Sequence, residues 1–141
     1  MIRQYEKWAK FQIEWRKARN ASVKGIEFPF PYRKGQRDLA VSVYRTILWK
    51  KKLFIQAPTG VGKTISTVFP AVKAVGEELG EKIFYLTAKT ITRTVAEQAF
   101  ETLREQNLKF KVITLTAKEK ICFCEETSCN PDDCPYAKGH F

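Results

Sequence analysis

The chain has 141 residues, 44% of them hydrophobic, and a formal net charge of +10. This length and composition are typical of one globular domain or part of one, and they exclude a disordered chain. No apolar run approaches the roughly 20 residues that span a bilayer, and the first residues lack the apolar core of a secretory signal, so we expect a cytoplasmic protein with no membrane partner.

Four helices and three strands are predicted along the chain. Residues 2–20 mix apolar and charged residues without Gly or Pro, which predicts a helix, and the Pro-containing stretch 25–31 predicts an extended linker. Further helices are predicted over 35–49, over 62–79 with a bend at Pro70, and over 90–106. Short apolar strands are predicted at 53–56, 82–87 and 111–116. We expect the buried side chains of the second and last helices to be Leu39, Val43, Ile47 and Leu48, and Ile91, Val95, Ala99, Phe100 and Leu103, respectively.

Strand and helix alternate from residue 53 onward. This order predicts an α/β fold, a parallel sheet with helical crossovers. Ligands of such sheets lie beyond the carboxyl ends of the strands.

The positive charge is concentrated in the first third of the chain. Residues 1–52 contain 14 Lys or Arg and 4 Asp or Glu, whereas residues 53–141 contain 11 of each. Aromatic residues are interleaved with the basic ones, at Trp8, Phe11, Trp15, Phe28, Phe30 and Tyr32. This combination favours a polyanion with stackable bases, as in a nucleic acid. The alternative is a solvated basic helix whose aromatic side chains pack inward.

A phosphate-binding loop is predicted at residues 57–64, Ala-Pro-Thr-Gly-Val-Gly-Lys-Thr, between a predicted strand and a predicted helix. Its glycines let successive backbone N–H groups face one anion, and the helix N-terminus adds positive potential. The candidate nucleotide-binding residues are Thr59, Gly60, Val61, Gly62, Lys63 and Thr64. Lys63, which would reach the outer phosphates, and Thr64, which would hold Mg²⁺, are the candidate catalytic residues. The alternative is a glycine-containing turn without a ligand.

A glutamine precedes this loop in Tyr32-Arg33-Lys34-Gly35-Gln36-Arg37. Its amide offers one donor and one acceptor, the pair that matches N6 and N7 of adenine. Gln36, with Arg33 beside it, is therefore a candidate contact for ATP. The alternative is an ordinary polar residue on a helix surface.

A second anion site is predicted at Thr87-Ala88-Lys89-Thr90, where a predicted strand leads into a helix. Small hydroxylated residues at a helix N-terminus suit phosphates, which in a nucleotide-driven motor would belong to a nucleic acid. In the alternative interpretation Thr90 caps the helix, and both roles are compatible.

Four cysteines lie within 13 residues, at Cys122, Cys124, Cys129 and Cys134. Clustered cysteines in a reducing cytosol indicate a metal or cluster rather than disulfides. Their gaps differ from the paired two-residue gaps of zinc modules and suit an iron–sulfur core, with zinc and unligated thiols as alternatives. In an extended segment Cys122 and Cys124 would point to opposite sides, which would leave one of them outside the ligand set.

Together these motifs resemble the start of the first motor domain of iron–sulfur superfamily 2 DNA helicases, the XPD/DinG type. Residues 32–37 resemble the Q motif of that family, 57–64 motif I and 84–90 motif Ia, and the cysteine run falls where the family inserts its cluster domain. The resemblance covers residues 28–141. It implies a partial RecA-like domain at 28–117 and the start of a cluster domain at 118–141, while charge and pattern predict a basic, helical segment at 1–27.

The resemblance implies ATP, Mg²⁺ and a 4Fe–4S cluster as cofactors, and single-stranded and forked DNA as partners. It also implies 5′-to-3′ unwinding in DNA repair or replication. It assigns adenine to Gln36, phosphates to the loop, single-stranded DNA to Thr87, Ala88, Lys89 and Thr90, and the cluster to Cys122, Cys129 and Cys134, while Cys124 is left unassigned.

The sequence contains no Asp-Glu-Ala-His-like acidic motif and no second motor domain. We therefore expect a fragment that binds nucleotide weakly and neither hydrolyses it efficiently nor unwinds DNA. The alternative is a zinc-stabilised nucleic-acid-binding module with a non-hydrolysing phosphate loop. Iron and sulfide in the protein would favour the helicase, and zinc alone would favour the module.

Overall fold

The computed structural model describes residues 2–124 and 130–138. Four α-helices lie in the described chain, α1 (Ile2–Gly25), α2 (Gln36–Leu48), α3 (Lys63–Gly76) and α4 (Thr90–Arg104), followed by a 3-10 turn at Lys118–Lys120. The chain forms two compact units, Met1–Phe110 and Lys111–Phe141, and the four α-helices belong to the first. Among these described helices, none combines the length and apolar character needed to cross a membrane.

The predicted α/β fold is wrong, because residues 2–124 and 130–138 contain no strand and therefore no RecA-like parallel sheet. The segments predicted as strands, 53–56, 82–87 and 111–116, run without regular secondary structure. Their apolar side chains are largely exposed, at 92% for Phe54, 88% for Leu86 and 82% for Ile113. A strand of a parallel sheet is buried on both faces. The apolar runs that predicted strands therefore do not mark buried segments in this structure.

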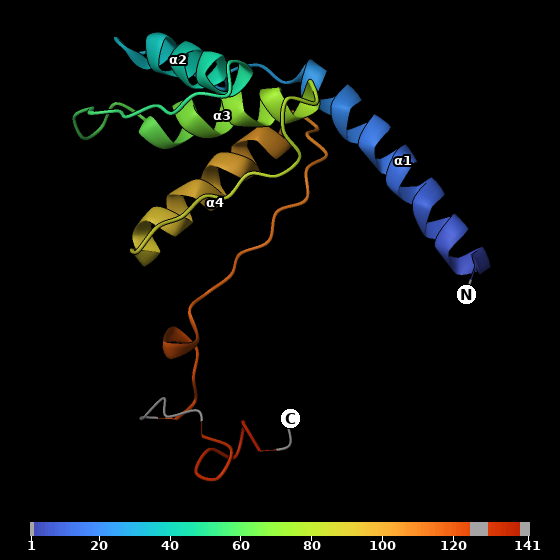
Figure 1. Ribbon diagram of the computed structural model, residues 1–141. Coiled ribbons are helices and arrows are strands. Elements are labelled where there is room, and N and C mark those ends of the chain that lie inside the picture. The colour runs from blue at the N-terminus through green and yellow to red at the C-terminus, as the bar shows by residue number, and fades with distance from the viewer. Residues whose placement is uncertain (1, 125–129, 139–141) are drawn as a thin grey trace. The chain divides into compact units, whose positions relative to one another are not determined.

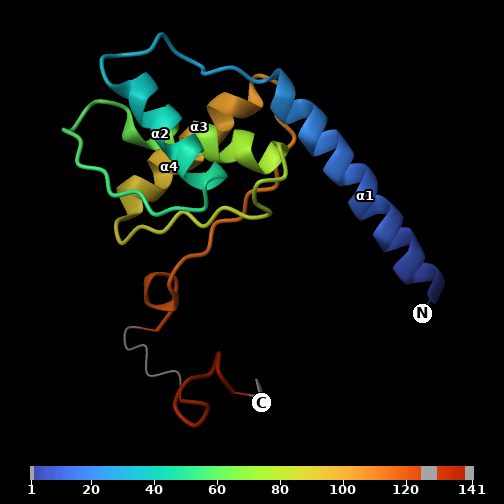
Figure 2. The ribbon, with the colours of Figure 1, turned by 45° about the horizontal axis from the view of Figure 1, so that its top comes forward.

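The first unit is a helical assembly centred on α3. Helices α1, α2 and α4 all contact α3, as Figures 1 and 2 show from two directions. Its core is apolar and is drawn from α1, α3, α4 and the segments that follow α1 and α4: Val23, Ile26, Ile65, Val68, Val72, Ala99, Phe100, Leu103 and Leu108. Burying each larger side chain contributes about 1.5–3 kcal/mol. Pro70 lies inside α3 and is also buried.

The predicted helices are confirmed, but their predicted buried faces are confirmed only in part. In α4, Ala99, Phe100 and Leu103 are buried as expected, whereas Ile91 and Val95 are 79% and 41% exposed. The buried residues of α4 all lie between Ala96 and Leu103, so the residues before Ala96 include none that is buried.

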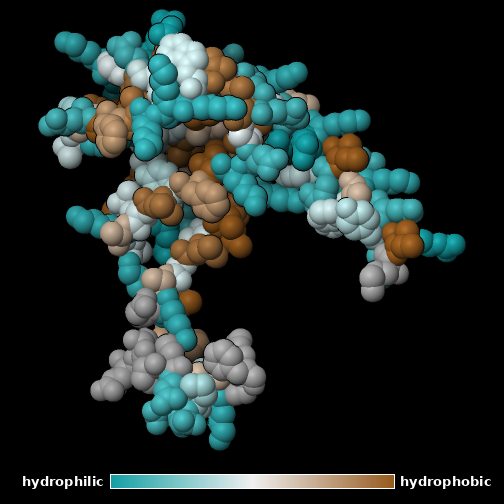
Figure 3. All heavy atoms as spheres, in the orientation of Figure 1, coloured by the Kyte–Doolittle hydropathy of each residue, from teal (hydrophilic) through white to brown (hydrophobic). Residues whose placement is uncertain are grey.

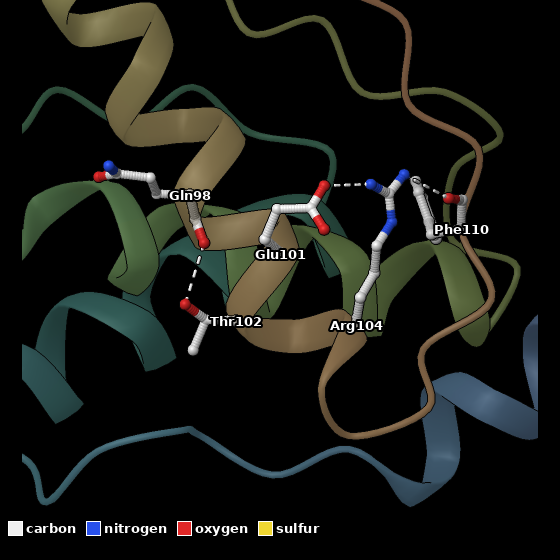
Figure 4. Close-up of polar contacts among 5 residues, drawn as sticks. All are labelled: Gln98, Glu101, Thr102, Arg104 and Phe110. Carbon is white, nitrogen blue, oxygen red and sulfur yellow. Dashed lines mark hydrogen bonds and ion pairs between the residues drawn. The ribbon is translucent and has the colours of Figure 1, made fainter.

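Polar contacts fix the carboxyl end of α4 (Figure 4). The Thr102 hydroxyl donates to the Gln98 carbonyl at 2.9 Å, and Arg104 pairs with Glu101 and donates to the Phe110 carbonyl at 3.3 Å. A cation in the last turn also interacts favourably with the helix dipole. Arg104 therefore joins the end of α4 to the end of the first unit.

The carboxyl end of α1 is fastened to α3. Lys73 Nζ donates to the carbonyls of Val23 at 2.9 Å and Lys24 at 3.3 Å, which satisfies acceptors that a helix end leaves unpaired. Val23 packs against Gly76, where a Cβ would come within 2.3 Å of the valine. From this attachment α1 extends away from the other three helices (Figures 1 and 2).

Candidate functional site: a phosphate loop held by a polar turn

Residues 57–62 form a loop that leads into α3. Gly60 and Gly62 have φ angles of +83° and +70°, left-handed conformations in which glycine has no Cβ to strain. Gly62 directly precedes α3, and its carbonyl accepts the N–H of Ser66 at 3.2 Å. The first N–H groups of a helix have no acceptor within the helix and face outward along its axis. The loop therefore has the backbone geometry of an anion site.

Lys63, the first residue of α3, is exposed and folds back over this loop. Its Nζ donates to the carbonyls of Ala57 at 2.8 Å and Pro58 at 3.1 Å. Thr64 is half-buried, and its carbonyl accepts the Thr67 hydroxyl at 2.9 Å. The ammonium thus lies beside the loop, where phosphate oxygens would offer stronger, charge-assisted bonds than these two carbonyls.

A turn at residues 33–36 holds both glycines of the loop. The Gln36 N–H donates to the Arg33 carbonyl at 3.0 Å, and Gln36 Oε1 accepts the Arg33 N–H at 2.9 Å. The Arg33 guanidinium donates to the Gly60 carbonyl at 2.8 Å. Gln36 is 4% exposed, and its Nε2 lies so close to Gly62 that a Cβ there would be 2.3 Å away. These side chains connect the start of α2 to the loop before α3.

The burial of Gln36 rules out the surface interpretation of this residue. Its amide oxygen already serves the turn, and its amide nitrogen packs against the loop. A primary amide has two N–H donors and two acceptor lone pairs, so capacity remains for an adenine. The contact with the loop was missed by sequence reasoning. Gly35 adopts a φ of +79° and turns the chain directly before α2, but this local feature does not indicate what Gln36 contacts.

Thr87, Ala88 and Lys89, which precede α4, and Thr90, its first residue, are all exposed. The Thr87 hydroxyl lies 3.3 Å from both the N–H and the carbonyl oxygen of Lys89. Lys89, not Thr90, is the residue before the first turn of α4, so the capping role considered for Thr90 is wrong. The hydroxyls and the lysine are accessible to a ligand at the start of this helix.

In the second unit, Cys122, Cys124 and Cys134 lie in the described part of the cysteine run, and Cys129 lies outside it. The Sγ atoms of Cys124 and Cys134 are 3.9 Å apart. Cys134 is buried, and backbone N–H groups, first that of Tyr136 and then that of Ala137, lower the pKa of its thiol against the opposing effect of burial. Burial, followed by the neighbouring thiols of Cys134 and Cys122, raises the pKa of Cys124.

This thiol pair is suited to a soft metal, although it is not a complete site. Among the described residues, no group of three or more His, Cys, Asp and Glu side chains is arranged to hold a metal ion. Two thiols at 3.9 Å, one of them disposed to ionise, nevertheless fit the chemistry of iron–sulfur or zinc ligation. Residues 121–124 form a turn and bends rather than an extended segment, so alternation does not exclude Cys124.

Two of three comparisons with known proteins give a match. Residues 37–124 match the family model described as DEAD/DEAH box helicase. A protein named probable ATP-dependent helicase, from Methanocaldococcus jannaschii, is 34% identical over 98 residues, which cover 68% of this chain and 14% of that protein. The chain therefore spans about a seventh of the length of this relative. No solved structure matches the chain.

Proposed function

The chain belongs to the DEAD/DEAH box helicase family, and on that basis we propose that it forms the nucleotide-binding start of an ATP-dependent DNA helicase. The observation that carries this proposal is the loop 57–64, with two left-handed glycines, Lys63 folded over it and α3 directly behind it. Family membership supports ATP and Mg²⁺ as ligands and a nucleic acid as partner.

Each group of the site has one task in this proposal. When nucleotide binds, the Lys63 ammonium gives up its hydrogen bonds to the Ala57 and Pro58 carbonyls and donates to the outer phosphates instead. The backbone N–H groups of the loop and of α3 bind the same phosphates. The Thr64 hydroxyl holds Mg²⁺, which neutralises phosphate charge. The remaining hydrogen-bonding capacity of Gln36 contacts adenine, and Arg33 keeps Gly60 in place.

The nucleic acid is proposed to be DNA, single-stranded or forked, and bound at Thr87–Thr90. The exposure of these residues supports this contact, because hydroxyl and ammonium groups are suited to phosphate oxygens. The resemblance to XPD/DinG-type helicases supports 5′-to-3′ unwinding in the complete protein, in DNA repair or replication.

We extend the proposal to a 4Fe–4S cluster in residues 118–141. Cys124 and Cys134 would hold it together with Cys122 and Cys129, which adds Cys124 to the ligand set implied by the resemblance. In the XPD/DinG-type helicases that the chain resembles, the cluster domain helps to separate the two DNA strands, and we propose the same role for this segment. The proximity of two thiols and the lowered pKa of Cys134 support cysteine ligation by these residues. Such ligation requires reduced thiols, which is consistent with a cytoplasmic location.

The experiment is a metal and nucleotide analysis of the 141-residue chain purified without oxygen. We expect equal amounts of iron and acid-labile sulfide, a broad visible absorption band, and ATP binding without efficient turnover. Zinc alone would identify a zinc-stabilised module instead of an iron–sulfur helicase. Robust ATP hydrolysis by this chain would contradict the expectation that it binds nucleotide without efficient turnover, because an acidic Mg²⁺-binding motif is needed for turnover.

A further inference from the structure

The first four turns of α1 carry aromatic side chains that the protein does not bury. Tyr5, Trp8 and Phe11 are 67%, 57% and 51% exposed, so the interpretation of inward-packing aromatics is wrong for Trp8 and Phe11, whereas Phe28 packs against the core. Figure 3 shows this part of α1 as hydrophilic side chains with pale and brown ones between them. The helix is one continuous element from Ile2 to Gly25. Its carboxyl end is fastened to α3, so the aromatic part is joined to the first unit through one continuous helix.

The helical register gathers these aromatics on one face. At 3.6 residues per turn, Tyr5, Trp8, Phe11 and Trp15 project within about 120° of one another. The rings of Tyr5 and Trp8 are 5.9 Å apart between centroids, with their planes tilted by 32°. Two glutamines, Gln4 and Gln12, fall within the same sector. We call Tyr5, Trp8, Phe11 and Trp15, with these glutamines, the aromatic face.

Positive charge borders the aromatic face. Helix α1 contains seven Lys or Arg and two Glu residues. Lys7 lies one turn before Phe11, and Arg16 lies one turn after Gln12, so one cation stands at each edge of the face. The rings can stack on bases, and the flanking cations can pair with phosphates. A single nucleic acid strand offers both groups in every nucleotide.

We propose that the aromatic face of α1 is an accessory binding site for single-stranded nucleic acid. It lies on a different element from Thr87–Thr90, the strand contact proposed for the motor. It also needs no nucleotide, because α1 contributes no residue to the loop 57–64 or to the turn 33–36. The inference therefore goes beyond the helicase function and does not depend on the ATP site.

The composition of the face favours a nucleic acid over a lipid surface. A helix that lies in a membrane interface buries a continuous apolar face. Here the amides of Gln4 and Gln12 stand among the rings, and burying an amide in hydrocarbon without a partner is costly. Base edges, in contrast, offer both donors and acceptors to an amide.

The test is an anisotropy titration of the 141-residue chain into a labelled oligothymidylate, at low salt and without nucleotide. Replacing both rings, Tyr5→Ala with Trp8→Ala, is expected to weaken binding ~10-fold or more, because each stacked base depends on its aromatic partner. Trp8→Leu keeps an apolar helix-forming residue but cannot stack, and should weaken binding severalfold. Lys7→Gln with Arg16→Gln should reduce the salt slope by about 1.4, since each phosphate contact contributes roughly 0.7.

Ile13→Ala is the matched control, because Ile13 is 57% exposed on the same helix but lies outside the aromatic face. It should leave binding unchanged. If the double variant loses helical circular dichroism, Trp8→Leu decides the outcome. Unchanged binding in the ring variants, with loss in Lys89→Ala, would overturn the proposal in favour of the motor contact alone. Binding to phosphatidylserine vesicles that the oligonucleotide cannot displace would overturn it in favour of a lipid surface.

Discussion

The phosphate loop and the cysteine segment 118–138 are held in different ways. The loop is fixed by the protein itself, through the Arg33 and Gln36 contacts and through Ile65 and Ser66, which are buried in the first turn of α3. The described part of the cysteine segment leaves Ile121, Phe123 and Tyr136 at least 60% exposed, and the Sγ atoms of Cys124 and Cys134 are 3.9 Å apart in it. A site held by packing and hydrogen bonds keeps its shape without a ligand, whereas a segment held by a metal, as we propose for the cysteine segment, folds with its metal. Nucleotide binding and metal binding should therefore be separable.

The largest effect expected from this comparison is on the metal. Cys134→Ser should abolish the visible band and the bound iron, because it removes the buried thiol that backbone N–H groups predispose to ionise. ATP affinity should remain within about twofold, since the loop does not depend on this segment. Metal analysis and ATP titration of the same sample measure both. A parallel loss of ATP binding would show that the two regions are not independent.

The second effect concerns the contact between Gly62 and Gln36. Gly62→Ala adds a Cβ 2.3 Å from the Gln36 amide, at a φ of +70°. A strain of about 2 kcal/mol corresponds to roughly 30-fold weaker ATP binding if the loop must keep this shape.

Gly25→Ala is the control, because nothing lies within 4 Å of a Cβ there. Gln36→Ala removes the clash partner but also the proposed adenine contact, so it should weaken ATP binding by itself. If Gln36 and Gly62 are in contact, the double variant should lose less binding free energy than the two single variants added together. An additive loss would mean that the Gln36 amide does not restrain the loop at Gly62.

A smaller effect is expected from Arg33. Its bond to the Gly60 carbonyl is exposed, so Arg33→Ala should cost about 1 kcal/mol, roughly fivefold in ATP affinity. Arg37→Ala, an exposed change one turn later, is the control and should have no effect. Equal losses in both variants would point to general charge attraction rather than support of Gly60.

The sequence was a good guide where local rules decide the structure. The glycines at 60 and 62, followed by Lys63, predicted a loop and a helix start, and both are present. Helical periodicity placed α2, α3 and α4. The prediction of strands was wrong for a physical reason. Apolar runs such as those around Phe54, Leu86 and Ile113 form buried strands only if other elements cover them, and in this structure these side chains are exposed.

Two contacts of the candidate sites could not be derived from local sequence. Gln36 is buried because α2 and α3 bring it against Gly62, a contact between residues 26 positions apart. The proximity of Cys124 to Cys134 arises because residues 121–124 bend, which removes the alternation assumed for an extended segment. Both depend on tertiary geometry, which neither periodicity nor motif spacing contains.

The most direct test of the central claim is a calorimetric titration of Mg–ATP into the unmodified chain and into Lys63→Met. The account predicts measurable binding by the unmodified chain and at least a tenfold loss in the variant, because the ammonium that lies over the loop is the cation for the outer phosphates. Lys82→Met, which removes an exposed charge between α3 and α4, should bind as the unmodified chain does. Equal affinity in the Lys63 variant and the unmodified chain would contradict the assignment of this loop as the nucleotide site.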